Sequence, residues 1–592
     1  MSYKLLISQK GFCTIKPIIP KRKVSKILRG YKNHKRLIIN EIVKRFGVKK
    51  CEILRGSFLI NENFIFTYCF TYLCPMKNLP IGIQTLTEIR AKNYVYVDKT
   101  RLVHQLATTG KYYFFSRPRR FGKSLLISTL KELYLGNKPV FEGLWIEDKW
   151  DWSKTNPVVH FSFDEMDYKK LGLETVILND LKRLSKLHKV RLTSVGVKSQ
   201  FKELLEKVSK KHGKVALLID EYDKPIIDFL EKHEIEQAKF NRDVLREFYG
   251  VLKNSDELLE LVFITGISKF AKVSLFSHLN NLDDITTMEK YGTLTGYTEA
   301  ELVHYFSDYL EIIAQKLNLT HESLLEKMRT WYNGYSWDGV NRLYNPFGTL
   351  KFLANQRFEN FWSATGSPQF LVQQMRKITF FNVENVAINS RILEKYDIEN
   401  LELIPLLFQT GYLTVKSIDA MTGNMVLDYP NKEVRESMYE FLIDDVAKNP
   451  QRIHTGMTIM DLEKAFVSRD LEKVKTILNS LLADLPVEAY LKQTEGLYHG
   501  LIHLVFKYLG LFVNSEVHSS QGHADSVVQT LTDVYIFEFK FNKTAQEGID
   551  QIKKQDYAGK YRASDKVITG IGVNFNADKD KKGIDEWVEE VL

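Results

Sequence analysis

A glycine–lysine–serine triplet lies between a strand-like and a helix-like segment, where it could bind phosphate. It ends the stretch Arg117-Pro-Arg-Arg-Phe-Gly-Lys-Ser124, which follows the apolar run 111–115 and precedes a helical pattern over 124–135. In such a loop the backbone N–H groups surround phosphate oxygens, and the helix start adds partial positive charge. We therefore expect Lys123 to reach the β- and γ-phosphates of a nucleotide and Ser124 to bind Mg²⁺.

The loop departs from the usual pattern G-x-x-x-x-G-K-[ST] at its first position, where this chain has Arg117. Pro118 and two further arginines make it stiff and basic. Taken alone, the triplet is equally consistent with an ordinary strand–turn–helix joint. The expected nucleotide-binding residues of the loop are Arg119, Arg120, Gly122, Lys123 and Ser124.

An acidic pair that could complete the same site follows this loop by roughly 100 residues. Asp220 and Glu221 directly follow the buried-strand pattern 215–219. An Asp at this place binds the Mg²⁺ shell, and a Glu polarises the attacking water. An acidic pair after a strand is otherwise an ordinary helix cap. The two elements together, in this order, have the features of Walker A and Walker B motifs and predict an ATPase.

A third apolar strand, 259–265, is followed by Ser268. In P-loop ATPases of the additional-strand type, a polar residue at the end of such a strand senses the γ-phosphate. Thr265 or Ser268 is a candidate for this role, and a plain strand cap is the alternative. We include Ser268 among the expected nucleotide-binding residues.

A second set of carboxylates lies near the C-terminus. Glu538 and Lys540 are two residues apart in the strand pattern 534–541, so their side chains share one face. A hairpin with the preceding strand, 524–530, brings Asp525 near Glu538. Two carboxylates form a hard oxygen site for Mg²⁺ or Mn²⁺, and such a metal activates water against a phosphodiester. Lys540 is expected to orient that water or neutralise the phosphate.

Residues outside the hairpin extend this candidate site. Glu495, on a helix predicted over 494–509, could complete the metal shell, and Gln551 on the following helix is consistent with the same architecture. His499 and His503 are better explained by helix packing or by proximity to phosphate. The alternative is that Glu538 and Lys540 form a solvated pair on a surface sheet. The expected metal ligands are Ser124 and Asp220 at the first site, and Glu495, Asp525 and Glu538 at the second.

The fold class predicted from these patterns is α/β. Nearly continuous apolar strands alternate with helices, one helical pattern covering about 171–209, which favours a parallel sheet covered on both faces. After about 298 the pattern is helical, beginning with a capping box at Thr298 and Glu301. Short strands are expected at 411–416 and 425–429, and the last hundred residues are mixed α/β. The expected domains are a leader, 1–75; a P-loop domain, 76–300; a mostly helical middle region, 301–484; and a C-terminal domain, 485–592.

The leader differs in composition from the rest of the chain. Its 16 Lys and Arg against 3 Asp and Glu give it a charge of +13, so the other 517 residues sum to −3 because the whole chain carries +10. It is interpreted as a basic nucleic-acid-binding arm, as a targeting segment, or as sequence upstream of a true start at Met76. The absence of cysteine from the other 517 residues fits a reducing cytoplasm. The sequence has no uninterrupted apolar stretch of about 18 residues, so we expect no membrane-spanning helix. All four cysteines lie in the leader: Cys13, Cys51, Cys69 and Cys74.

Several motifs from Met76 onward resemble those of the AAA-ATPase-like family. In that family an arginine at the position of Arg117 is usual, so this departure is a family trait. The C-terminal motifs resemble the PD-(D/E)XK nuclease domain that typically follows. The motifs are Leu79-Pro-Ile-Gly-Ile83, Tyr96-Val-Asp-Lys-Thr100, Arg117 to Leu125, Ile219-Asp-Glu-Tyr-Asp-Lys-Pro225, Thr265-Gly-Ile-Ser-Lys-Phe270, Asn280-Asn-Leu282, Tyr332-Asn-Gly-Tyr335, Tyr498-His-Gly-Leu501, Ala524-Asp525 and Phe537-Glu-Phe-Lys540.

The resemblance implies a P-loop NTPase core and a C-terminal PD-(D/E)XK-type domain. It implies ATP binding, and DNA cleavage as an expectation from the fold. Three hypotheses follow: an ATP-dependent nuclease acting on nucleic acid, a nucleotide-gated binding switch with an inert nuclease fold, and a structural protein in which both sites are vestigial. The expected catalytic residues are Glu221, Asp525, Glu538 and Lys540. The sequence leaves the oligomeric state open.

Overall fold

The computed structural model divides the chain into two units, Met1–Asn78 and Leu79–Leu592. In the first unit, β1 (Lys4–Ile7) and β2 (Cys13–Lys16) form an antiparallel pair. The rest of the leader, including Cys51, Cys69, Cys74 and the basic run 21–50, lies outside the described residues. The structure describes residues 4–7, 13–16, 76–231, 233–269, 275–276, 279, 281–362, 383–389, 392, 402–419, 421–447, 455–483, 495–510, 514–517, 524–575 and 583–592.

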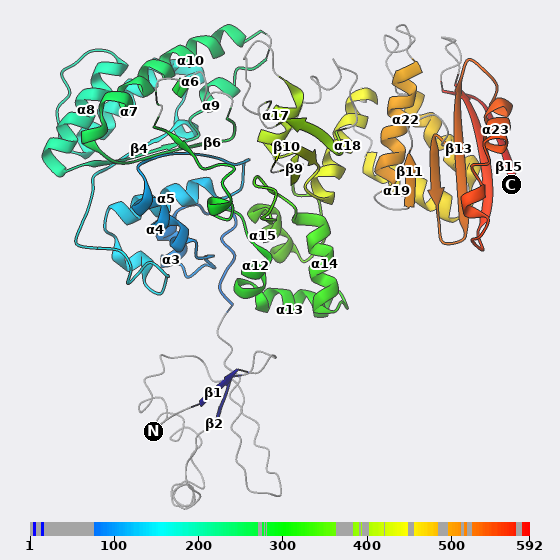
Figure 1. The fold of residues 1–592 in the computed structure, drawn as a ribbon, viewed down its shortest axis with the longest axis horizontal. Helices are drawn as coiled ribbons and strands as arrows, with labels where there is room; N and C mark the ends of the chain where they lie inside the picture. The colour runs from blue at the N-terminus through cyan, green and yellow to red at the C-terminus, as the bar shows by residue number, and fades with distance from the viewer. Residues whose placement is uncertain are drawn as a thin grey trace, which may run out of the picture. The chain divides into compact units, whose positions relative to one another are not determined.

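The predicted parallel sheet is present and has five strands. They are, in spatial order, β4 (Val158–Ser162), β5 (Val215–Asp220), β6 (Leu259–Gly266), β3 (Tyr112–Ser116) and β7 (Asp283–Asp284). Figure 1 labels β4 and β6 of this sheet. All neighbours are parallel, so their carboxyl ends lie at one edge. Since β6 separates β3 from β5, the sheet is of the additional-strand type, as predicted. Only the two-residue β7 was not predicted.

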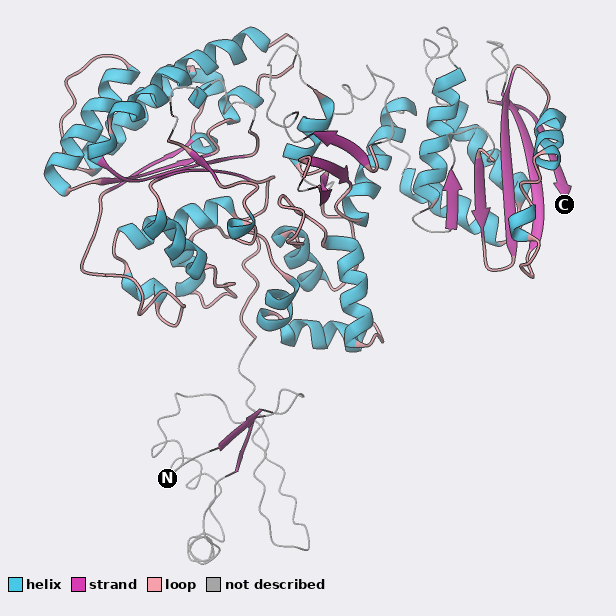
Figure 2. Cartoon of the chain, viewed as in Figure 1, coloured by secondary structure: helices cyan, strands magenta, loops and turns pink. Residues whose placement is uncertain are grey.

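Helices cover both faces of this sheet, because successive strand residues point to opposite sides. Leu217 belongs to the apolar core beneath one set of helices, and Leu218 belongs to the core beneath the other. Figure 2 shows the two helical layers with the strands between them. The first set is α6 (Tyr168–Leu171), α7 (Leu173–Leu187), α8 (Val197–His212), α9 (Lys224–Ile227) and α10 (Ile235–Gly250); the second is α3 (Leu86–Ala91), α4 (Thr100–Thr109) and α5 (Lys123–Tyr134).

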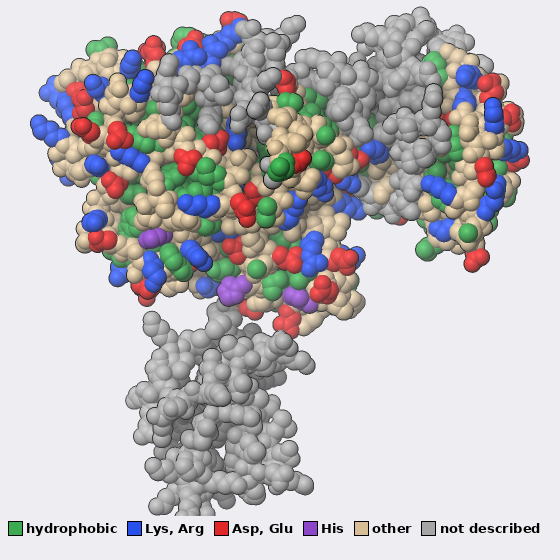
Figure 3. All heavy atoms as spheres, in the orientation of Figure 1, with side chains coloured by type: hydrophobic (Ala, Val, Ile, Leu, Met, Phe, Trp, Pro, Cys, Tyr) green, Lys and Arg blue, Asp and Glu red, His purple; other side chains and the backbone are tan. Residues whose placement is uncertain are grey.

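The single helical stretch predicted over 171–209 is wrong in one respect, because the chain forms two helices there. Lys189 and Gly196 have φ values of +53° and +84°, which a right-handed helix cannot include. The intervening turn lets α7 and α8 pack side by side on the sheet. Over the face seen in Figure 3, Lys and Arg alternate with Asp and Glu in this part of the molecule.

The middle region is mostly helical and carries a small antiparallel sheet in the order β8-β10-β9. The predicted capping box is confirmed, since Thr298 accepts from the Glu301 N–H at 3.2 Å and Glu301 accepts from the Thr298 N–H at 2.8 Å. Strand β8 was not predicted. The elements are α12 (Glu299–Tyr305), α13 (Ser307–Lys316), α14 (His321–Tyr332), α15 (Pro346–Asn355), β8 (Val386–Asn389), α17 (Leu403–Thr410), β9 (Thr414–Ile418), β10 (Asn424–Asp428), α18 (Lys432–Ala447), α19 (Thr455–Val467) and α20 (Leu471–Ala483).

The C-terminal part is a mixed five-stranded sheet in the order β11-β12-β13-β14-β15. Strands β13 and β14 are parallel and the other neighbours antiparallel. The predicted hairpin is β12 with β13, whereas β11 and β15 were not predicted. No helix among the described residues is long and apolar enough to cross a bilayer. The elements are α22 (Glu495–Leu509), β11 (Asn514–Val517), β12 (Ser526–Gln529), β13 (Asp533–Phe541), α23 (Ala545–Lys554), β14 (Val567–Phe575) and β15 (Ile584–Val591).

Candidate functional site

The phosphate loop runs from the end of β3 to the start of α5. Strand β3 ends at Ser116 and α5 begins at Lys123, one residue earlier than predicted. Arg120 and Gly122 have φ values of +71° and +84°, which turn the chain sharply before the helix. No atom lies within 4 Å of the position that a Cβ would take on Gly122. The loop thus leaves an open space at the helix N-terminus, where backbone N–H groups converge.

Lys123 is buried beside this space. Its ammonium donates to the Pro118 carbonyl at 3.2 Å. Burial lowers the pKa of Lys123, and the charges of Glu221 and Asp220 oppose that shift. A buried cation with one carbonyl acceptor is well placed to receive a phosphate oxygen.

The acidic pair lies at the end of β5, next to the same loop. Burial raises the pKa of Asp220, and the Ser124 hydroxyl and the Lys123 ammonium oppose the shift. Burial also raises the pKa of Glu221. The structure therefore brings together the four residues that the sequence singled out: Lys123, Ser124, Asp220 and Glu221.

Glu221 adopts a backbone conformation that side chains rarely take, with φ at +53°. Such a conformation costs about 1–3 kcal/mol and occurs where surrounding structure holds it in place. The adjacent Asp220 carboxylate accepts from the Glu221 N–H at 3.0 Å, and the Tyr222 N–H donates to the Thr265 carbonyl at 3.1 Å. These bonds hold the backbone of Glu221 in this conformation at the end of β5.

The two hydroxyls considered as phosphate sensors occupy different environments. The Ser268 hydroxyl donates to Asp223 at 2.6 Å, and the Ser268 N–H donates to the same carboxylate at 2.7 Å. The Thr265 hydroxyl is buried with no hydrogen-bond partner among the described residues. Asp223, which sequence reasoning did not single out, thus anchors the loop after β6. A Cβ on Gly266 would lie 2.4 Å from an Asp223 oxygen, so only glycine fits there.

The three arginines of the loop have separate surroundings. Arg119 is exposed, whereas Arg120 donates to the Phe361 carbonyl at 3.2 Å and lies 3.8 Å from the centre of the Phe347 ring. Arg117 is fully buried against the Trp337 ring at 4.0 Å. Burial lowers the pKa of Arg117 to about 9. The residue that replaces the first glycine therefore supports the loop from within the protein.

Glu433, at the start of α18, is a further buried carboxyl near this loop that sequence reasoning missed. It accepts from the backbone N–H groups of Phe361 at 2.8 Å and Trp362 at 2.9 Å. Burial raises the pKa of Glu433 to about 8, from an ordinary value of 4.5, despite opposing effects of these two bonds and of Arg120.

This shift predicts a measurable pH dependence of stability. Between about pH 4.5 and 8 the folded chain binds the Glu433 proton and the unfolded chain does not, so stability falls as pH rises through this window. A tenfold difference in proton affinity corresponds to about 1.4 kcal/mol. Glu433→Gln is neutral at every pH. We therefore expect the melting temperature of this variant, relative to that of the wild type, to rise as the pH is raised from 5 to 9. The exposed Glu472→Gln is the control, and parallel pH profiles for all three proteins would refute the assignment.

The C-terminal residues Glu538 and Lys540 lie on one face of β13, as predicted. The Lys540 ammonium is 2.9 Å from one Glu538 oxygen and donates to the Gln551 side chain on α23 at 2.7 Å. Glu538 is buried, and its second oxygen, Oε2, has no hydrogen-bond partner among the described residues. An unpartnered buried carboxylate oxygen fits a metal ligand.

Asp525 stands beside this pair, as the hairpin predicted. Its carboxylate accepts a hydrogen bond from the N–H of Phe539, a residue of β13, at 2.8 Å. Burial, followed by the charge of Asp525, raises the pKa of Glu538 to about 6, and Lys540 opposes the shift. Two carboxylates that repel each other in a buried place are a donor set that a divalent cation would stabilise.

The third expected ligand of this site has no described side chain. Glu495 is the first residue of α22, and the side chains of Glu495, His499 and His503 lie outside the described part of the chain. Among the described side chains, no three or more His, Cys, Asp or Glu are grouped to hold a metal. The described donor set is therefore Asp525 and Glu538, with Lys540 beside them.

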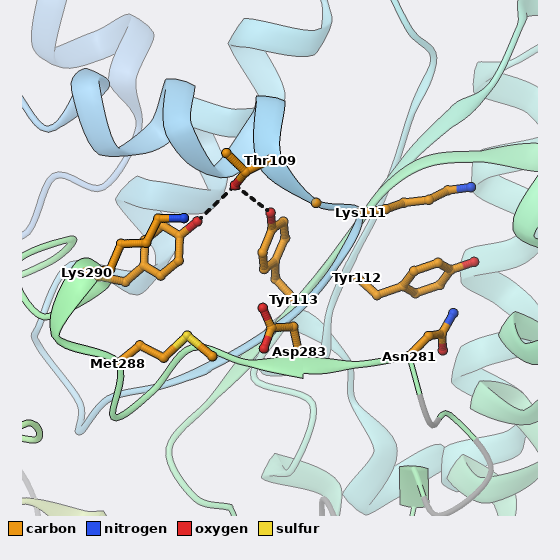
Figure 4. Close-up of a pocket in the computed structure, with 10 residues that line it drawn as sticks. Thr109, Lys111, Tyr112, Tyr113, Asn281, Asp283, Met288 and Lys290 are labelled. Carbon is orange, nitrogen blue, oxygen red and sulfur yellow. Dashed lines mark hydrogen bonds between the residues drawn. The ribbon is translucent and has the colours of Figure 1, made fainter.

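A separate pocket of about 330 Å³ lies at the opposite end of β3 from the phosphate loop (Figure 4). The Thr109 hydroxyl forms hydrogen bonds there with the Tyr113 and Tyr291 hydroxyls, each 3.3 Å long. Lys111, which also lines it, is paired with Asp256 at 2.8 Å. Because β3 runs away from this pocket toward Ser116, the pocket is distinct from the nucleotide site.

Comparisons with known proteins agree with the two families that the sequence motifs resemble. Residues 80–276 match a family described as predicted AAA-ATPase, and residues 493–585 match the PD-(D/E)XK nuclease superfamily. The chain is 37% identical over 522 residues to the uncharacterized protein in the vnfD 5′ region of Azotobacter chroococcum mcd 1, covering 85% of this chain and 97% of that protein.

The similarity to a solved structure is much weaker than the similarity to this relative. The Aeropyrum pernix ORC1 protein, solved in complex with DNA, is 11% identical, with 58% of this chain and 92% of that chain covered. The TM-score is 0.22, which is too low to bear on the fold or on a ligand of this chain.

Proposed function

Because the chain belongs to the family of predicted AAA-ATPases with a C-terminal PD-(D/E)XK nuclease-superfamily domain, we propose that it binds and hydrolyses ATP and thereby controls a Mg²⁺-dependent nuclease-like domain that acts on nucleic acid. The convergence of Lys123 and Ser124 with Asp220 and Glu221 carries this proposal. We also propose that the domains are 76–300, 301–484 and 485–592, that the basic leader is 1–75, and that the protein works in the cytoplasm.

At the first site each side chain has one role. Lys123 binds the β- and γ-phosphates, while the Ser124 hydroxyl and the Asp220 carboxylate hold Mg²⁺, which would neutralise phosphate charge. Arg119, Arg120 and Gly122 line the phosphates, and Ser268 is the candidate sensor through its bond to Asp223. Glu221 polarises the attacking water, because its carboxylate lies at the carboxyl end of β5 with the pKa raised toward that of a base.

Replacement of Glu221 separates binding from hydrolysis. A general base contributes roughly 10²- to 10⁴-fold to a rate, so Glu221→Gln should lower ATP hydrolysis by about that factor while ATP binding stays within about twofold. The measurement is steady-state phosphate release beside a binding titration. Glu236→Gln, on the exposed side of α10, is the control. Undiminished hydrolysis in Glu221→Gln would exclude Glu221 as the base.

At the second site Asp525 and Glu538 would hold the metal, Mg²⁺ or Mn²⁺. When bound, that cation lowers the pKa of a water and stabilises charge on a phosphodiester. Lys540, fixed by Glu538 and Gln551, places its ammonium where it can orient the water or neutralise the phosphate. Glu495 is proposed as a third ligand from its position at the start of α22.

A second candidate function is a nucleotide-gated binding switch with an inert nuclease fold. The observation that favours it is the Lys540 ammonium, which already occupies one Glu538 oxygen at 2.9 Å. This function requires ATP binding and no cleavage of any nucleic acid. Cleavage that depends on Asp525 would exclude it.

A further inference from the structure

The phosphate loop is held in place by residues that lie far beyond the P-loop domain. Phe121 packs edge-on against Tyr335, with ring centres 4.7 Å apart. A Cβ on Gly411, at the end of α17, would lie 2.7 Å from the Pro118 ring, so loop and helix end are in direct contact. With Arg117 on Trp337 and Arg120 on Phe361, four loop residues contact the middle region.

Glu433 fixes the part of the middle region that Arg120 contacts. The Phe361 carbonyl accepts a hydrogen bond from Arg120, and the Phe361 N–H donates one to Glu433. The Glu433 carbonyl also accepts from the side chain of Asn360 at 3.2 Å. Residues 360–362 are thereby clamped between the phosphate loop and the first turn of α18. Any shift of Arg120 on phosphate binding acts on that turn.

Helix α18 extends from this turn to the C-terminal part of the chain. Glu440, two turns or about 10 Å further along the helix, accepts from the Tyr508 hydroxyl of α22 at 2.6 Å. The neighbouring Tyr439 hydroxyl donates to Glu384, which also pairs with Lys507 of α22. Four side chains of α18 and α22, two of them through Glu384, thus join the two helices by buried or half-buried polar contacts.

Helix α22 in turn supports the strand of the second site. Phe506 packs on Phe537 and Phe539, with ring centres 4.9 and 5.8 Å apart. These phenylalanines flank Glu538 on β13 and face away from it, because side chains alternate along a strand. A displacement of α22 therefore displaces the backbone that holds Glu538.

From this continuous set of contacts we propose that α18 transmits the nucleotide state of the phosphate loop to the nuclease-like domain. Glu433 acts as the positioning residue at its ATP end, and the Tyr508–Glu440 bond as the joint at its other end. The inference rests on the proposed function, since it assumes that the loop binds ATP. It adds the structural element that connects the two sites and the residues at which the connection can be broken.

The ATP end is tested by two substitutions of Glu433. Glu433→Ala leaves two buried N–H groups without an acceptor, so we expect the affinity for Mg²⁺ and ATPγS to fall by about tenfold. Glu433→Gln keeps an oxygen acceptor and should restore the affinity to within about twofold of wild type. Equal affinity in all three proteins, or failure of Gln to restore it while the fold is intact, would overturn the positioning role.

The other end is tested by amide hydrogen exchange of the full chain with and without Mg²⁺ and ATPγS. In the wild type we expect nucleotide to change exchange in α22 by about fivefold or more. Tyr508→Phe should bind the nucleotide equally well and lose this change. The control Tyr535→Phe removes the hydroxyl of another tyrosine of the C-terminal part, which donates to the Phe466 carbonyl of α19. It should keep the nucleotide-dependent change in α22.

The outcomes separate the two proposals. If the wild type does not bind ATPγS, the proposed function fails. If it binds and α22 exchange stays unchanged, or if Tyr508→Phe responds as the wild type does, transmission through α18 is excluded while ATP binding stands.

Discussion

Lys123→Ala should weaken ATP binding strongly. Its ammonium is buried at the helix start, and its charge opposes the burial-induced rise in the pKa of both Asp220 and Glu221. Hydrogen bonds to charged groups contribute about 1.5–3 kcal/mol each, and Lys123 is expected to bond to two phosphates. We therefore expect the dissociation constant for Mg²⁺ and ATP to rise by about 100-fold, which corresponds to about 2.7 kcal/mol. Isothermal titration calorimetry measures this directly.

A matched control for this variant lies on the same helix. Lys131 is exposed in the last turn of α5, so Lys131→Ala removes an equal charge away from the loop and should bind ATP as the wild type does. Retained affinity in Lys123→Ala would show that the loop is not a phosphate site. Equal losses in both variants would show that only helix stability or net charge was affected.

Asp525→Asn should abolish any metal-dependent cleavage and lower the affinity for Mn²⁺. It neutralises one of the two described carboxylates of the second site, and it leaves the acceptor for the Phe539 N–H in place. Loss of residues that only support metal ligands typically costs about 10- to 100-fold, so loss of a ligand should cost about 100-fold or more. Nuclease assays with Mg²⁺ and Mn²⁺ titration of the protein supply independent readouts.

The control for this substitution is Asp550→Asn, on the exposed side of α23 in the same domain. It should retain both cleavage and metal affinity. Unchanged Mn²⁺ affinity in Asp525→Asn would contradict the metal site even if no nucleic-acid substrate had been found. Unchanged cleavage would place the chemistry elsewhere in the chain.

The core of both sites could be predicted because each depends on short-range rules. Asp220 ends β5, and Lys123 follows the end of β3 at the start of α5. Both strands have nearly continuous apolar runs, and parallel strands bring their carboxyl ends to one edge. Glu538 and Lys540 share a face by strand alternation, which the 2.9 Å contact bears out. The resemblance to family motifs then favoured these sites over ordinary caps and surface pairs.

The parts that could not be predicted depend on contacts between distant residues. Arg117 looked like a missing glycine, and nothing local shows that Trp337 would enclose it. Glu433 carries no motif, and its partners Phe361 and Trp362 lie about 70 residues away. Strand β15 was missed because Asp585, Glu586, Glu589 and Glu590 interrupt its apolar pattern at the edge of the sheet.

The claim that an ATP site controls a nuclease-like site is tested most directly by one matrix of cleavage rates. The full chain would be incubated with single- and double-stranded DNA and RNA, with Mg²⁺, with and without ATP, as wild type, Lys123→Ala and Asp525→Asn. We predict cleavage by the wild type that changes with ATP, loss of the ATP effect in Lys123→Ala, and loss of cleavage in Asp525→Asn. Cleavage that persists in Asp525→Asn, or that is indifferent to ATP and to Lys123→Ala, would contradict this claim, as would the absence of cleavage of every substrate.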